Sequence, residues 1–379
     1  MAALSLVAAA CGDDDATAAS DSATAANEGS GSSSEVAEDN ASADEADDGA
    51  TSDGAGSDED AATEAGLCAD GQREYTHPAL GTVDSVCIPE DPQRIAVFDP
   101  NMTSFMIQIG AEPVAHLDIW LTSLVQSHPG LADEVDAWTA NSTSVGPAPG
   151  EFNLEALAAA DPDIVLTADH YITEVRDQIE AIAPVVAFDY FTNPAADWSG
   201  ILEIYADAAN LDAELAESLT GIEQRIDVLA SELEDQEGET VSIVTNYTGD
   251  FQVLLSEWPV SLILERVGLA RPDSQGPEAE EAAGNGYNAP LSLERLDEID
   301  ADHLLVVQFS PEAAEGIEEL QAMDLYQSLD VVAAGEDHVV GGHFVTGGIY
   351  DIHKTIDELF LYVADVDPAD VSPNPLPTG

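Results

Sequence analysis

Aromatic side chains that could hold a bulky organic ligand recur in the predicted loops of both halves of the sequence. Trp120 and Tyr171 follow predicted strands in the first half, and Trp258 and Phe344 do so in the second. Aromatic rings offer rigid apolar area with a polar edge, which suits the binding of an organic molecule. Further candidates of the same kind are Tyr190, Tyr247 and Tyr287. We expect some of these residues to contact a ligand and the others to close the cores.

The eight histidines show neither the HxxxH nor the HxH spacing of a metal site. A zinc or manganese site needs three or four converging ligands. His170 and His343 fall in predicted loops of opposite halves, where they could bind haem iron together with Tyr171 or Tyr350. The sequence therefore predicts no metal site and no cofactor of the protein itself, and it leaves haem open as a ligand.

The sequence contains no nucleophile or phosphate motif of a common enzyme class. GxSxG, GxxxxGK[ST] and a GxGxxG after a strand are all missing. We therefore predict that the chain is not an enzyme. A surface adhesion or scaffold protein remains an alternative, because such a protein needs no binding cleft.

Acidic residues dominate the composition, with 76 Asp and Glu against 8 Lys and Arg. The net charge of −68 excludes a nucleic-acid partner, which requires a basic surface. Residues 12–66 carry 17 Asp or Glu and no Lys or Arg, which leaves −51 to the rest of the chain. High salt would screen such self-repulsion, so the composition indicates a salt-adapted surface.

The N-terminus resembles a bacterial lipoprotein signal. An apolar run, AALSLVAAA, precedes Cys11, which would be lipidated and would anchor the chain to the outer face of the cytoplasmic membrane. The run has no positive n-region, so we expect the true start to lie upstream of Met1. Residues 12–66 are polar and acidic and are expected to be a disordered spacer between the anchor and the folded part.

Two further cysteines, Cys68 and Cys87, are expected to form a disulfide, as cysteine pairs of exported proteins commonly do. They flank a predicted hairpin of residues 73–75 and 83–88. A metal site is disfavoured because the two thiols lack the CxxC spacing.

Strands alternate with helices after the hairpin, which predicts an α/β fold. Strands are expected at 94–98, 113–117, 163–167 and 184–188, and again at 241–245, 251–255, 302–308 and 338–340. Helices are expected at 102–110, 154–160, 171–182, 259–267, 291–299, 317–330 and 350–364. Residues 196–236 read as helical with a break near Asn210, and their second part is a long amphipathic helix.

The pattern predicts two doubly wound α/β lobes joined by one long helix, with a ligand cleft between the lobes. The expected parts are the signal remnant 1–11, the spacer 12–66, the N-terminal lobe 67–195, the helical connector 196–238, the C-terminal lobe 239–366 and a frayed tail 367–379.

Five segments resemble, in their order and spacing, the substrate-binding proteins of ABC importers for iron siderophores, haem and cobalamin, the periplasmic-binding-protein class with a single backbone helix. They are DPQRIAVFDP at 91–100, GEFNLEAL with DPDIVL at 150–166, IAPVV at 182–186, LERVGLARP at 264–272 and PLSLERL at 290–296. The resemblance covers residues 90–365. It implies capture of a ferric siderophore outside the cytoplasmic membrane and its delivery to an ABC permease with its ATPase, with haem or cobalamin as the alternative ligand.

In this family one glutamate on each lobe projects toward arginines of the permease. The matching positions are Glu155 and Glu294, each expected in the first turn of a short helix. Complementation of the helix dipole is the purely structural explanation for both.

Anionic siderophores are commonly bound by arginine. Arg94 and Arg295 look structural, and Arg266 and Arg271 lie on or just after a helix, which leaves Arg176 as a possible clamp. The scarcity of arginine favours a neutral or cationic chelate, such as a trihydroxamate.

Overall fold

The computed structural model describes residues 68–77, 80, 85–189, 198–246, 250–284, 286–310 and 313–376. Cys11, the spacer 12–66, Tyr190 and Tyr247 lie outside the described residues, so their predictions stay predictions. Within the described ranges, no helix is both long enough and apolar enough to cross a membrane.

A disulfide-linked hairpin opens the described chain. Strand β1 (Gln72–Tyr75) pairs antiparallel with β2 (Val86–Pro89), and Cys68 is bonded to Cys87, as predicted. The buried hydroxyl of Tyr75 donates to the carbonyl oxygen of Ile204 at 2.8 Å. The hairpin is thereby fixed to the helix that leaves the first lobe.

The N-terminal lobe is built on a parallel sheet of order β5-β4-β3-β6-β7. Its strands are β3 (Ile95–Val97), β4 (Ala115–His116), β5 (Thr143–Ser144), β6 (Ile164–Ala168) and β7 (Val185–Phe188). The central strands β3 and β6 are apolar runs without an exposed residue, as parallel strands covered by helices on both faces require. This is the doubly wound arrangement that the alternation of strands and helices predicted.

Helices connect these strands, and two of them begin at the caps that their sequences provide. Asp99 caps α1 (Pro100–Gln108), and Asn153 caps α4 (Leu154–Ala160) by accepting from Ala156 N at 3.0 Å. Helices α2 (Asp118–Ser127) and α3 (Ala132–Thr139) were not predicted.

The single helix predicted over 171–182 is wrong. The structure has α5 (Asp169–Ile172) and α6 (Arg176–Glu180), separated by a turn at Thr173–Val175. Val175 has φ −124° and ψ 6°, outside the helical region. Two β-branched residues in this turn lower the local helix propensity, whereas Ile172 and Ile179 remain buried on either side.

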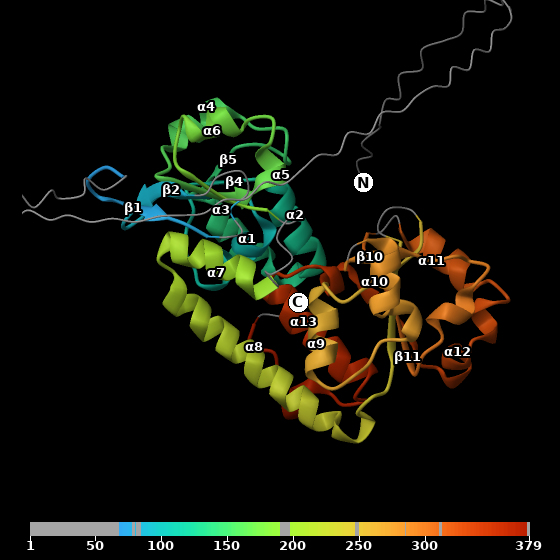
Figure 1. The fold of residues 1–379 in the computed structure, drawn as a ribbon. Helices are drawn as coiled ribbons and strands as arrows, with labels where there is room; N and C mark the ends of the chain where they lie inside the picture. The colour runs from blue at the N-terminus through green and yellow to red at the C-terminus, as the bar shows by residue number, and fades with distance from the viewer. Residues whose placement is uncertain are drawn as a thin grey trace, which may run out of the picture. The chain divides into compact units, whose positions relative to one another are not determined.

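The connector consists of α7 (Trp198–Ala209) and α8 (Asp212–Glu232), and the predicted break falls at Asn210, whose φ is +58°. The 21 residues of α8 extend about 31 Å at 1.5 Å per residue. Figure 1 shows α8 running from the first lobe to the second.

The C-terminal lobe has a mixed sheet of order β10-β9-β8-β11-β12. Strands β8 (Val241–Thr245), β11 (His303–Gln308) and β12 (Asp337–Gly341) are parallel, whereas β9 (Gln252–Leu254) runs antiparallel to both β8 and the edge strand β10 (Asn288–Pro290). This antiparallel strand makes the second lobe less regular than the first.

The helices of this lobe agree only in part with the sequence. Helix α9 (Pro259–Arg266) and helix α13 (Ile349–Tyr362) match their predictions, and α11 (Ala313–Gln321) and α12 (Asp330–Ala334) replace the one expected over 317–330. An unpredicted helix, α10 (Pro277–Ala283), precedes β10. The helix predicted over 291–299 is wrong: a turn leads into a 3-10 helix, η4 (Leu296–Ile299), because Arg295 has φ −128°.

The C-terminal tail is not frayed as far as Leu376, contrary to expectation. It forms α14 (Pro368–Val371), and the carbonyl oxygen of Ser372 accepts hydrogen bonds from the buried guanidinium of Arg225 on α8. The same guanidinium pairs with Asp357 of α13. A single arginine thus ties the connecting helix, α13 and the tail together.

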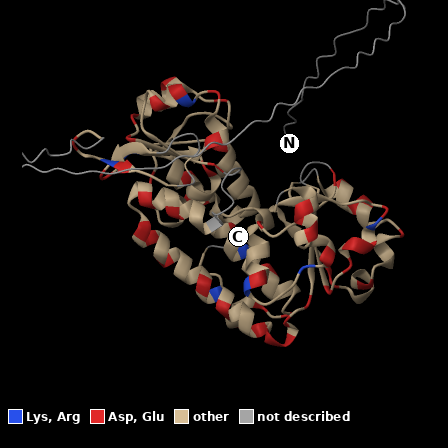
Figure 2. Ribbon diagram, in the orientation of Figure 1, with Lys and Arg blue, Asp and Glu red and all other residues tan. Residues whose placement is uncertain are grey.

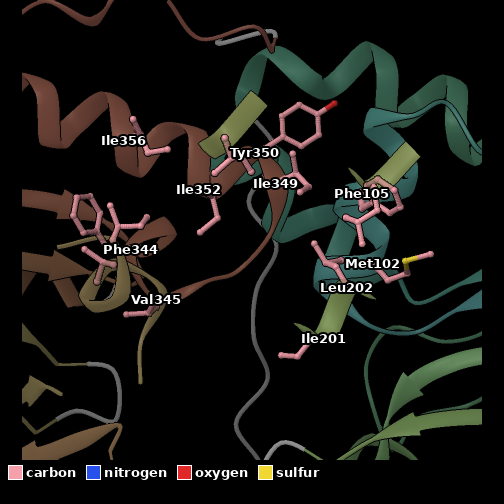
Figure 3. Close-up of a cluster of buried hydrophobic side chains, with 14 of the residues drawn as sticks. Met102, Phe105, Ile201, Leu202, Phe344, Val345, Ile349, Tyr350, Ile352 and Ile356 are labelled. Carbon is pink, nitrogen blue, oxygen red and sulfur yellow. The ribbon is translucent and has the colours of Figure 1, made fainter. Parts of the chain in front are cut away.

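One hydrophobic core spans the two lobes, and both lobes belong to one compact unit. Figure 3 shows Met102 and Phe105 of α1 and Ile201 and Leu202 of α7 on one side, and Ile349 to Ile356 of α13 on the other. Phe344 and Val345, in η6 (Gly342–Val345), belong to the same core. Helix α13 is therefore a second link between the lobes, beside α8.

Candidate functional site

The carboxyl ends of parallel strands meet at one edge of a sheet, and in an open α/β sheet this edge is the usual ligand site. In the N-terminal lobe the strand order reverses between β3 and β6. Phe98 and Asp99 follow β3, and Asp169, His170 and Tyr171 follow β6. The structure therefore brings the predicted loop residues of this lobe to its topological switch point.

Trp120, His170 and Tyr171 form the N-lobe aromatic group. The ring centres of Trp120 and Tyr171 are 5.3 Å apart, and those of His170 and Tyr171 are 4.1 Å apart. Trp120 and Tyr171 are half-buried against the core, and His170 is exposed. The indole of Trp120 donates from Nε1 to the carbonyl oxygen of Phe98 at 2.8 Å, which ties its ring to the end of β3.

Partial desolvation of His170, whose ring packs on Tyr171 while the residue stays exposed, lowers its pKa, and the charge of Asp189 acts in the opposite direction. The lower pKa favours the neutral imidazole in the N-lobe aromatic group.

Two buried polar residues, Asp99 and Tyr205, follow or pack against the strands that carry this group. Asp99 is fully buried, and its Oδ1 accepts from the backbone N–H groups of Asn101 at 2.9 Å and Met102 at 3.1 Å. The hydroxyl of Tyr205 donates to Thr167 O at 2.6 Å and lies 3.4 Å from Asp99 Oδ2. Burial and the charge of Asp99 raise the pKa of Tyr205, so this phenol stays protonated. Asp99 is a helix cap and no free ligand for a cation.

Arg176 does not lie free to bind an anionic ligand, which corrects its predicted role as a clamp. Its guanidinium pairs with Asp169 and with Glu180, the latter at 3.0 Å. The two carboxylates outweigh the one guanidinium, so this part of the sheet edge is net negative.

The C-terminal lobe distributes its candidates differently. Trp258 and Tyr287 form an edge-to-face pair with ring centres 5.5 Å apart, and Trp258 Nε1 donates to Tyr287 O at 2.7 Å. Burial, with the charge of Glu257, raises the pKa of Tyr287. Because β9 runs antiparallel to β8, this pair lies beyond the Leu254–Asn288 pairing of β9 with β10, and not at the loop at Asn246.

Phe344 and His343 are core residues, which corrects two further expectations. Phe344 has 0% of its surface exposed, so it offers no surface to a ligand in this structure. His343 is 2% exposed, and its Nε2 lies 3.0 Å from Oε2 of Glu358 on α13. A haem iron bound between His170 and His343 therefore does not fit this arrangement. Instead, Phe309, 39% exposed, follows the carboxyl end of β11 beside Gly342.

The two predicted docking glutamates are both exposed, but their local structures differ. Glu155 lies in the first turn of α4, as expected. Glu294 lies in the turn before η4, where its N–H faces Ser292 Oγ at 3.4 Å. Because no helix begins there, the helix-dipole explanation applies to Glu155 alone.

Sequence reasoning missed a polar contact between the lobes. His128, at the end of α2, places Nε2 2.7 Å from Asp351 Oδ1 of α13, and Lys354 Nζ donates to Ser127 O at 3.1 Å. The paired residues are more than 220 positions apart. No local pattern in the sequence signals such a pair.

A cavity of about 380 Å³ lies elsewhere, between Tyr75 of β1 and helices α7 and α8. Its acidic lining residues, Glu203, Asp207 and Asp212, are exposed, and Asp207 already pairs with Arg73. Within the described part of the chain, no three His, Cys, Asp or Glu side chains are grouped to hold a metal ion. The strand edges therefore remain the better candidate site.

The family model described as periplasmic binding protein matches residues 95–344. The chain belongs to this family. The match spans both sheets and the connecting helix, so the family fold covers the whole candidate site.

Several proteins similar to this chain are named or described for siderophore binding. The probable siderophore-binding lipoprotein YfiY of Bacillus subtilis is 26% identical over 290 residues, which cover 75% of this chain and 86% of YfiY. Among solved structures, Staphylococcus aureus SirA complexed with staphyloferrin B has a TM-score of 0.62 at 18% identity, covering 77% of this chain and 98% of SirA. Streptococcus pneumoniae PiaA in complex with ferrichrome has a TM-score of 0.55 at 20% identity, covering 74% of this chain and 95% of PiaA. At these identities the two structures establish the fold, which agrees with the two-lobe prediction.

Proposed function

We propose that this chain is an extracytoplasmic receptor that captures a ferric siderophore and delivers it to an ABC permease. The observation that carries the proposal is the two-lobe fold over residues 95–344, in a chain whose relative YfiY is named as a probable siderophore-binding lipoprotein. A receptor of this kind binds its ligand and releases it unchanged, so we propose no enzymatic activity.

The N-lobe aromatic group supports this proposal. It combines half-buried rings with a backbone-anchored indole at the switch point of the sheet. Such an edge offers a flat, pre-organised apolar face to an organic chelate without ordering flexible side chains. Haem is the weaker candidate, because His343 lies in the core beside Glu358.

Fluorescence titration in 1 M KCl tests the proposal on the chain from residue 67 onward, with ferric siderophores, haemin and cobalamin as ligands. We expect saturable quenching of tryptophan fluorescence by at least one ferric siderophore. The gallium complex of the same siderophore is the control for inner-filter effects. Quenching by haemin alone would transfer the proposal to haem, and binding of none of the ligands would favour a scaffold protein.

Glu155 and Glu294 are the proposed contacts to the permease. Both are exposed, and both lie outside the aromatic group, so replacing them should spare ligand binding. We expect Glu155→Ala with Glu294→Ala to leave the dissociation constant unchanged and to lower uptake of labelled iron by cells. Loss of ligand binding in the double variant would contradict this assignment.

We further propose that Cys11 carries a lipid anchor, as the names of the relatives suggest. Metabolic labelling with a fatty-acid analogue should mark the full-length protein and leave a Cys11→Ser variant unlabelled. Labelling of both proteins would contradict the anchor at Cys11.

A further inference from the structure

All eight Lys and Arg side chains of the chain lie among the described residues, and each has at least one hydrogen-bond or ion-pair partner within the chain. Figure 2 shows how few they are beside the acidic residues of both lobes. Resting on the proposed function, we infer that the receptor selects ferric siderophores that are neutral or positively charged, and discriminates against carboxylate and catecholate chelates with excess negative charge.

Five of the eight cations are held by groups that belong to the scaffold. Arg73 pairs with Asp207, Arg225 with Asp357 and Arg266 with Glu223. Arg94 donates to the carbonyl oxygens of residues 160 and 161. Arg271 donates to Leu254 O, Ser261 and Gln275. Burial lowers the pKa of Arg271 to about 10, which leaves it charged at neutral pH. Its guanidinium nonetheless donates to residues of its own lobe.

The other three cations lie on segments that come after the carboxyl end of a strand in the chain. Arg176 follows β6 and pairs with Asp169 and Glu180. Arg295 follows β10 and lies 2.6 Å from Glu298. Lys354, beyond β12, donates to Ser127 O across the lobe contact. Each of the three already has an acceptor of this chain.

Acidic groups prevail at the same edge. Asp118 lies two residues before Trp120 in the first turn of α2, Asp169 begins α5, and the charge of Asp189 acts on His170. Arg176 is the cation paired within this edge. The segments that carry the N-lobe aromatic group therefore hold more acidic than basic residues.

The charge of a ferric siderophore follows from its donors. Three hydroxamate monoanions balance Fe³⁺, whereas three catecholate dianions or several carboxylates leave the complex negative. Recognition of such an anion relies on bidentate guanidinium contacts, which salt does not screen at contact distance. To form one here, Arg176 must first lose Asp169 or Glu180, whereas a neutral or cationic complex needs no such exchange.

Four probes test the inference by fluorescence quenching in 1 M KCl: ferrichrome, which is neutral, ferrioxamine B, which is cationic, ferric citrate and a ferric tricatecholate. We expect the two hydroxamates to bind at least about tenfold more tightly than the two anions. Tighter binding of either anion than of both hydroxamates would overturn the inference and leave the siderophore function standing. Binding of none of the four overturns the proposed function and the inference with it.

A gain-of-function variant tests the same idea from the other side. Asp169→Asn with Glu180→Gln releases Arg176, and we expect ferric citrate to bind about tenfold more tightly than to the unaltered chain. Glu223→Gln with Asp227→Asn is the matched control, because it releases Arg266 at the connecting helix, away from the strand edge. Circular dichroism verifies that both variants fold. Equal affinity of the first variant and the unaltered chain for ferric citrate would overturn the role of Arg176 pairing in selectivity.

Discussion

Each of the two lobes contains its own five-stranded sheet, but aromatic residues after the strands lie in different environments in the two lobes. The N-terminal lobe keeps Trp120 and Tyr171 half-exposed at the carboxyl ends of its strands. The C-terminal lobe buries Phe344 completely and uses it, with α13, to build the core that joins the lobes. Aromatic residues after a strand thus stay partly in solvent in one lobe and build the shared core in the other.

This difference follows from the elements next to each loop. In the first lobe the loops after β4 and β6 lead into short helices at the sheet edge, so aromatic rings stay partly in solvent. In the second lobe η6 leads into α13, which packs on α1, α8 and α9. Ligand contacts are therefore expected chiefly from the first lobe, and rigidity of the lobe pair chiefly from the second.

The largest expected difference is between the effects of replacing Phe344 and Trp120 on stability and on ligand binding. Phe344→Ala removes a fully buried ring and should lower the free energy of unfolding by about 3–5 kcal/mol. Trp120→Ala removes a half-buried ring and should cost less stability but weaken siderophore binding by about tenfold or more. Chemical denaturation and ligand titration of both variants check this. A Phe344→Ala variant of native stability with weakened binding would reverse the comparison.

The attachment of the connector to each lobe gives a second contrast. On the side of the C-terminal lobe, Arg225→Ala leaves the partly buried carboxylate of Asp357 with Asn374 but without its charged partner, and we expect a loss of about 3 kcal/mol. On the side of the N-terminal lobe, Tyr205→Phe removes the hydroxyl bond to Thr167 O, for which about 1 kcal/mol is expected. Arg295→Ala is the exposed control and should cost less than about 1 kcal/mol. Equal losses in Arg225→Ala and Arg295→Ala, by thermal unfolding, would show that the tail network contributes nothing.

Acid should weaken the second lobe through His353. Burial, with the charge of Arg225, lowers the pKa of His353 to about 3 from an unfolded value near 6.5. Between these values the unfolded chain binds a proton that the folded chain does not, so stability falls as the pH drops from about 6.5 toward 3. His353→Gln should flatten this decline in pH-dependent denaturation, whereas His338→Gln, which removes a ring stacked on Tyr362, should not. Identical pH profiles of His353→Gln and the unaltered chain would count against this origin.

The smallest expected effect concerns the polar contact between the lobes. Asp351→Asn weakens the pair with His128 and should cost about 1 kcal/mol, because the shared core remains. Hydrogen exchange should show faster opening at α13 and at the end of α2, with β3 and β6 unchanged. Uniformly faster exchange in both sheets would mean that the polar pair, and not the core, holds the lobes together.

Much of this architecture could be predicted from local patterns. The strands that contain Ile95, Ile164 and Ile243 are mainly apolar runs, Asn153 is a helix cap, and Cys68 pairs with Cys87 as predicted. Residues close together in the sequence determine most of these features, so the sequence alone is enough to predict them.

The errors concern features that distant residues decide. Phe344 looks like a loop residue in sequence, and only the packing of α13 over it makes it core. Arg176 is separated from Asp169 by a turn that replaced a predicted helix, so their pairing could not be foreseen. The antiparallel pairing of β9 with β10 likewise joins strands that α9 and α10 separate in the chain, and it moved Trp258 and Tyr287 to a separate group.

The most direct test of the account is the dissociation constant for ferrichrome of the unaltered chain and of Trp120→Ala, measured by isothermal titration calorimetry in 1 M KCl. The account predicts saturable one-to-one binding by the unaltered chain and at least about tenfold weaker binding by the variant. Equal affinity of the two proteins, or no binding of any ferric chelate by the unaltered chain, would contradict it.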